Sequence, residues 1–80
     1  MLNSNQVLIA NEINKYLSVN WLKPEEVQTI QDLLFSKFGN TLVTFELKYS
    51  FNNDFQKVEI GLKELIAYIV ELELKYSKIN

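Results

Sequence analysis

The sequence has no cysteine, no histidine and no arginine among its 80 residues. Without histidine, the chain has no side chain that changes charge near neutral pH and no imidazole ligand for a metal. Without cysteine, it has no thiolate nucleophile, no zinc knuckle and no disulfide. Without arginine, it lacks the guanidinium that binds phosphate or guanine through two parallel hydrogen bonds. We therefore expect no cofactor and no metal site.

Glycine and proline are scarce as well, with two glycines and one proline, so most of the chain can adopt regular structure. The longest uninterrupted apolar run, 65–70, is too short to span a membrane. Residues 1–14 have neither a basic N-terminal region nor a long apolar core, so we expect no signal peptide. Together with the absence of cysteine, these features predict a cytoplasmic protein without membrane association.

Length and charge limit the other classes of function. A chain of 80 residues is expected to form a single domain, 1–80, and a domain of this size buries only about 60% of the surface that its unfolded chain exposes. Stability then depends on good internal packing or on an oligomer that shares a core. The net charge of −2, from ten acidic residues and eight lysines, gives no general attraction to nucleic acid or to an anionic membrane.

Two helices are predicted in the N-terminal half of the chain. Apolar residues at spacings of three and four predict the first helix at about 5–18. The second helix begins at Pro24, whose missing N–H is not needed in a first helical turn. Gly39 is expected to end this helix in the left-handed conformation. Its predicted buried residues are Val27, Ile30, Leu34 and Phe38, flanked by Leu33 and Phe35.

A change of period follows the second helix. Apolar and polar residues alternate strictly over 43–51, which predicts a half-buried β-strand. One interpretation pairs this strand with the residues before Gly61 in a hairpin that turns at Asn53-Asp54. This register joins opposite charges and places apolar residues together. Its opposite residues are Lys48 with Glu59, Leu47 with Ile60, and Tyr49 with Val58.

The alternative to the hairpin is one long helix that begins at Asp54, because apolar residues keep spacings of three and four from there to the C-terminus. The predicted strand would then have to pair with another chain, since its backbone groups need partners. The hairpin is favoured because Val58 and Ile60 are β-branched and because Gly61 disfavours a helix interior. With the hairpin, the predicted fold class is α+β, in the order α-α-β-β-α.

Both interpretations predict a helix from Leu62 to about Lys78. Its apolar sector is wider than a core of this size needs, so we expect side chains to remain for a protein partner or a second copy. Glu73 points into that sector. Either the apolar stripe runs off the core near the end of the chain, or Glu73 meets a lysine of the same chain or of a second subunit. The expected partner or dimer contacts on this helix are Tyr68, Val70, Glu73 and Leu74.

The connection between the first two helices, 18–23, is apolar for a loop, since it contains Val19, Trp21 and Leu22. We weigh two interpretations of Trp21. Its indole either covers the core beside the first two helices or is an exposed anchor for a partner, a role in which tryptophan is enriched.

Catalysis is not expected. General acid–base chemistry needs two carboxylates that converge in a cleft with shifted pKa values, and most carboxylates here fall on predicted solvent-facing sides of helices and strands. The serines and threonines have no histidine to act as a base, and the chain has no glycine-rich phosphate loop. We therefore expect a protein that is not an enzyme.

The order of elements resembles that of a winged-helix DNA-binding domain, with 24–38 as the reading helix and 43–60 as the wing. This is an analogy of fold alone. A DNA reader needs several cations directed at the phosphates, whereas the outward side of the second helix is net negative. The lysines that would contact nucleic acid are Lys48, Lys57 and Lys63.

The function that the sequence favours is a small, non-enzymatic interaction or regulatory protein. It would bury apolar side chains against a protein partner, as a homodimer with the third helix near the two-fold axis. Small adaptors, inhibitors and accessory factors of mobile elements have this profile. The alternative is a winged-helix-like DNA-binding protein.

Overall fold

The structure, a computed structural model, describes residues 4–49 and 59–77. Within these residues it contains three α-helices, joined by short 3-10 turns and two short strands. No helix in the described ranges has the length and hydrophobicity needed to cross a bilayer. The helices are α1 (Ser4–Ser18), α2 (Val27–Phe38) and α3 (Leu62–Ser77), the 3-10 turns are η1 (Pro24–Glu26) and η2 (Gly39–Thr41), and the strands are β1 (Trp21–Leu22) and β2 (Glu59–Ile60).

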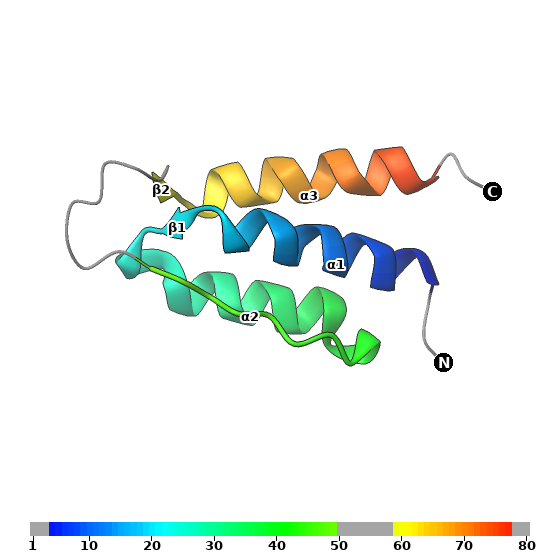
Figure 1. Cartoon of the computed structure of the whole chain (residues 1–80), viewed down its shortest axis with the longest axis horizontal. Coiled ribbons are helices and arrows are strands. Elements are labelled where there is room, and N and C mark those ends of the chain that lie inside the picture. The colour runs from blue at the N-terminus through cyan, green and yellow to red at the C-terminus, as the bar shows by residue number, and fades with distance from the viewer. Residues whose placement is uncertain (1–3, 50–58, 78–80) are drawn as a thin grey trace.

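The three helices lie side by side, with α1 between α2 and α3 in the view of Figure 1. Apolar residues at spacings of three and four give each helix one buried face, and these faces meet in a single core with Leu22 and Ile60 of the strands. The α+β class predicted from the sequence is confirmed. The core residues of the helices are Ile9, Ala10, Ile13 and Leu17 of α1, Ile30, Leu34 and Phe38 of α2, and Leu65, Ile69 and Leu72 of α3.

The predicted hairpin is wrong, because β1 lies between the two segments that it would have joined. β2 pairs with β1 in parallel, and Leu22 stands opposite Ile60. On the other side of β1, the Leu22 amide donates a hydrogen bond of 2.8 Å to the carbonyl of Lys48. The predicted pairs of Lys48 with Glu59 and of Leu47 with Ile60 are therefore not formed.

The reason for this difference lies in the connection between α1 and α2. Leu22 is fully buried, with 0% of its surface exposed, so this connection passes through the core instead of over the surface. Backbone groups at such a depth need partners, and β1 finds them on both of its sides. The apolar character of 18–23 was the only signal of this arrangement in the sequence.

The long-helix interpretation is also wrong in the described part of the chain. Residues 59–60 form β2, and α3 begins only at Leu62. The proposed turn at Asn53-Asp54 and the proposed partner Val58 lie outside the described residues.

The end of α2 differs from the prediction as well. Gly39 has φ −58° and ψ −29°, so it continues the right-handed turn into η2. The left-handed residue is Leu42, with φ 60° and ψ 13°. Thr41 fixes this turn, because its buried hydroxyl donates to the Phe38 carbonyl at 2.6 Å and accepts from the Val43 amide at 3.3 Å.

Two carboxylates fix the start of α3. Glu64 accepts a hydrogen bond of 3.0 Å from the Gly61 amide, and Glu26 accepts one of 3.3 Å from the Leu62 amide. Both satisfy N–H groups that a helix start leaves without intrahelical partners. Hydrogen bonds from its own amide and from that of Gly61 hold the pKa of Glu64 below its ordinary value. Gly61 lies at the junction of β2 and α3, outside the helix interior that the sequence analysis disfavoured for it.

Candidate functional site

After η2 the chain turns back and runs along α2 in an extended conformation (Figure 1). In this extended segment, 43–48, the predicted alternation of burial is confirmed for 43–47. The segment is not a fully paired strand, however, since it meets the sheet only at its far end, where Tyr49 forms a parallel bridge to Leu22. Residues 50–51 of the predicted strand lie outside the described part of the chain. The half-buried odd-numbered residues are Val43, Phe45 and Leu47, and the exposed even-numbered ones are Thr44 and Glu46.

Backbone groups on one edge of the extended segment are hydrogen-bonded to α1 and β1, whereas those on the other edge have no partner among the described residues. The Thr44 carbonyl accepts a hydrogen bond of 2.9 Å from Asn14 Nδ2 of α1, and the Lys48 carbonyl accepts the one from β1. In extended backbone the N–H and C=O groups of alternate residues point to opposite edges. The main-chain groups of Phe45 and Leu47 therefore point away from α1 and β1, and no described residue is hydrogen-bonded to them. We call these groups the open edge.

A groove of about 620 Å³, the α2 groove, lies between α2 and the extended segment. This size is typical of ligand pockets. Two of its side chains are unusually exposed for their type, Phe35 at 78% and Leu42 at 83%. None of the lining residues that the structure describes carries a charge. They are Val27, Gln31, Leu34, Phe35, Phe38 and Gly39, followed by Leu42, Val43, Thr44, Phe45, Leu47 and Tyr49.

Leu42 combines two features that do not favour the folded monomer. A left-handed conformation costs a residue with a Cβ roughly 1–2 kcal/mol relative to the right-handed one, and glycine or asparagine adopts it more easily. The side chain also gains little from burial, because it is almost fully exposed. Such strain is characteristic of functional positions, and here it lies at the rim of the α2 groove.

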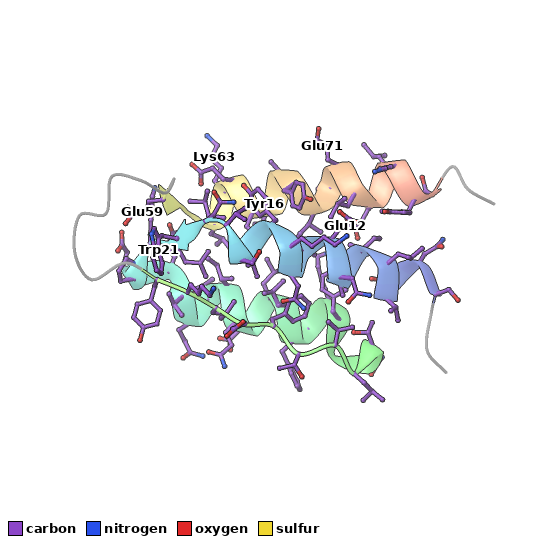
Figure 2. The ribbon with its side chains drawn as sticks, viewed as in Figure 1. Glu12, Tyr16, Trp21, Glu59, Lys63 and Glu71 are labelled. Atoms are coloured by element: carbon purple, nitrogen blue, oxygen red, sulfur yellow. The ribbon has the colours of Figure 1, made fainter. Side chains whose placement is uncertain are left out.

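The sequence placed the partner contacts on the third helix, and the structure divides them between two environments. Val70 and Leu74 are exposed, as expected, and form with Ile66 a row at intervals of four residues that we call the α3 ridge. Tyr68 is half-buried instead, and its ring stacks on Tyr16 with centroids 4.1 Å apart and planes at 18°. Figure 2 shows Tyr16 on the side of α1 that faces α3. Tyr68 thus belongs to the contact between these two helices.

The structure gives Glu73 a partner in the same chain. Its carboxylate lies 3.6 Å from the ammonium of Lys37 in α2, and both side chains are about two-fifths exposed, so the pair contributes little to stability. Trp21 is half-buried in β1 opposite Glu59, and the two lie together in Figure 2. Trp21 is therefore neither completely covered nor a freely exposed anchor.

The lysines proposed for nucleic-acid contact lie on different elements. Lys48 is half-buried beside β1, whereas Lys63 is exposed on the side of α3 that points away from α1 (Figure 2). Glu71 points to this same side, and Glu64 interacts electrostatically with Lys63. Lys57 lies outside the described residues. The surroundings of Lys63 are therefore mixed in charge, which is unlike the basic face of a DNA reader.

Sequence reasoning missed the two most exposed large apolar residues of the α2 groove. Phe35 was placed beside the buried face of the second helix, and its position at the edge of the apolar stripe was a signal of another contact. No signal marked Leu42, because neither its left-handed backbone nor its exposure follows from a local pattern. The open edge was signalled, since the alternation over 43–51 describes a strand that needs a partner.

Comparison with known proteins gives no further guide, since the sequence matches no family model and no match was found among curated proteins or solved structures. Within 4–49 and 59–77, no group of three or more acidic side chains is arranged to hold a metal ion. The residues of the α2 groove and the open edge are thus the strongest basis for a function.

Proposed function

We propose that this chain is a small, non-enzymatic protein-binding module that acts by burying apolar surface against a partner. The observation that carries the proposal is the α2 groove, whose uncharged lining lies directly beside the open edge. An extended partner segment would add its backbone to the open edge and place alternate apolar side chains in the groove. This is the mode of recognition known as β-augmentation.

The chemistry of the groove supports binding over catalysis. Its polar side chains are those of Gln31, Thr44 and Tyr49, and these provide no carboxylate pair and no base beside a nucleophile. A partner is held there by shape and by burial. A cytoplasmic location and a regulatory or accessory role remain parts of the proposal.

The α3 ridge offers a second apolar surface, on which the sequence analysis placed the two-fold axis of a homodimer. It presents only side chains, because the backbone of α3 is hydrogen-bonded within the helix, so it is suited to packing against another helix. The α2 groove has main-chain hydrogen-bonding groups in addition, and these give a partner a defined direction and register.

Protein is a better partner for this surface than nucleic acid. A wing built from 43–60 would require the hairpin, and β2 pairs with β1 instead. Among its described lining residues, the α2 groove has no cation to meet a phosphate, and phosphate contacts provide most of the affinity of DNA-binding proteins.

Selection of displayed peptides on the purified chain tests this proposal. We expect peptides with alternating apolar residues, and we expect Phe35→Asp to weaken their binding at least about tenfold because it places a charge in the groove. Phe35 is largely exposed, so this variant should keep its fold, which circular dichroism checks. The matched control is Val70→Asp on the α3 ridge, which should leave peptide binding unchanged. Peptides that bind Phe35→Asp as tightly as the original chain, or a DNA complex that persists at physiological salt, would contradict the proposal.

A further inference from the structure

We propose that the partner at the open edge is a second copy of this chain, which pairs antiparallel through the extended segment, with a two-fold axis at Leu47. This inference rests on the proposed function, because it names the partner of the same open edge. Three observations carry it: the direction of the backbone groups, the order of the charges, and the side to which the apolar residues point.

The backbone groups fix which residues can lie on the two-fold axis. In an antiparallel pair, two residues that face each other across the hydrogen-bonded position exchange both of their backbone hydrogen bonds. Leu47 at the axis would donate to the Leu47 carbonyl of the second copy and accept from its amide. Both groups belong to the open edge. The even-numbered residues cannot take this position, because the carbonyls of Thr44 and Lys48 already face α1 and β1.

The charges favour the same register. With Leu47 on the axis, Glu46 stands opposite Lys48 of the second copy, and Lys48 stands opposite its Glu46. These are non-hydrogen-bonded positions, where the side chains of antiparallel strands come closest, and opposite charges stabilise such a pair. Because the arrangement is symmetric, each dimer gains two oppositely charged pairs.

Other registers are less favourable. An axis at Phe45, the other residue of the open edge, would place Glu46 opposite Thr44 and would form no charge pair. An axis at Glu46 or Lys48 would place like charges opposite each other, which destabilises a sheet. A shift by one residue would place apolar side chains opposite polar ones. Among the described residues, the axis at Leu47 alone satisfies both the open edge and the charges.

The apolar side chains of the two copies would then meet on one face of the joined segments. Residues directly opposite each other in a sheet point to the same face, and Phe45 and Leu47 lie on the face that packs against the core in each copy. In this register Leu47 stands opposite Leu47 of the second copy, and Phe45 stands opposite its Tyr49. Each copy would contribute the same residues, which makes the interface self-complementary.

Exchanging the charges of Glu46 and Lys48 tests the register, with dimerisation measured by sedimentation velocity. We expect the original chain to form a reversible dimer, and Glu46→Lys or Lys48→Glu alone to raise the dissociation constant at least about tenfold. An equimolar mixture of the two variants should form a heterodimer within about threefold of the original affinity, since each lysine of one variant then meets a glutamate of the other. Circular dichroism should show that both variants retain the helix content of the original chain.

Several outcomes would overturn the inference. These are an original chain that stays monomeric up to its solubility limit, charge variants that dimerise as the original does, and a mixture that gains no affinity. Loss of the dimer in Val70→Asp alone would place the two-fold axis at the α3 ridge.

Failure of the proposed function gives a different result, and it is measured on the monomeric Glu46→Lys variant. If displayed peptides still bind its α2 groove, the function stands without the dimer, and if they ignore the groove, the function fails.

Discussion

The two glycines of the chain both lie at the end of an element, but an added side chain would be crowded at only one of them. Gly39 has ordinary right-handed angles, and an added Cβ would meet the Phe35 ring at 3.8 Å, a normal contact distance. An added Cβ at Gly61 would lie 2.5 Å from Glu26 Oε1. It would displace the carboxylate that accepts a hydrogen bond from Leu62 at the start of α3.

We therefore predict opposite effects for the same substitution at these two residues. Gly39→Ala should raise the free energy of unfolding by about 0.4–1 kcal/mol, because it restricts the unfolded chain without straining the folded one. Gly61→Ala should lower it by about 1 kcal/mol, the usual cost of a lost helix cap. Urea unfolding of the two variants measures both effects. Each variant serves as the control for the other. Equal changes of the same sign in the free energy of unfolding would show that the contacts around the two glycines do not determine the effect.

At the scale of the elements, α1 and α3 are joined by the stacked rings of Tyr16 and Tyr68. Burial raises the pKa of both phenols above the ordinary value of 10.0, and nearby acidic groups add to the effect. A raised pKa means that the folded state holds the proton more tightly than the unfolded state. The stability that depends on the neutral phenols is thus complete below pH 10.0 and is lost as the pH rises through the raised values.

This linkage predicts an alkaline weakness that the variant Tyr68→Phe reduces. Phenylalanine keeps an aromatic ring in the stack but has no proton to lose, so the fall in unfolding free energy between about pH 9 and about pH 11 should be smaller than in the original chain. Urea unfolding at the two pH values measures it. The comparison with the original chain is essential, and an identical fall in both proteins would show that the Tyr68 phenol is not the source of the weakness.

The elements differ in how far the sequence specifies them. The helices repeat their apolar residues over many turns, so the pattern alone predicted α1, α2 and α3 to within a few residues. β1 has only two residues, too few for any period to be seen, and its place between the extended segment and β2 depends on contacts far along the chain. The hairpin was a reasonable prediction from local charges, but the burial of Leu22 outweighed them.

The candidate site was predictable only in part, for a related reason. The alternation over 43–51 indicated a strand in need of a partner, and the width of the third helix indicated the exposure of Val70 and Leu74. The α2 groove arises because η2 turns the chain back along α2, and that turn depends on the left-handed Leu42 and the buried Thr41. A local pattern contains no signal for either.

At the scale of the whole molecule, stability of the monomer and association should be separable. Leu42→Asn tests this, because asparagine adopts the left-handed conformation more easily than leucine but provides no apolar side chain. We expect the variant to raise the free energy of unfolding of the monomer by about 0.5–1 kcal/mol through relief of backbone strain. We also expect it to bind the displayed peptides at least about threefold more weakly, since an apolar contact at the rim of the α2 groove is lost.

Two measurements distinguish these effects. Urea unfolding of the monomeric Glu46→Lys variant, with and without Leu42→Asn, gives the change in monomer stability, and peptide titrations on the same two proteins give the change in binding. Folding and peptide binding respond to a single substitution with opposite signs only if the strained residue is kept for the binding surface. A Leu42→Asn variant that is more stable and binds peptides as before would remove Leu42 from the binding surface, and one that is less stable would show that the exposed leucine supports the monomer itself.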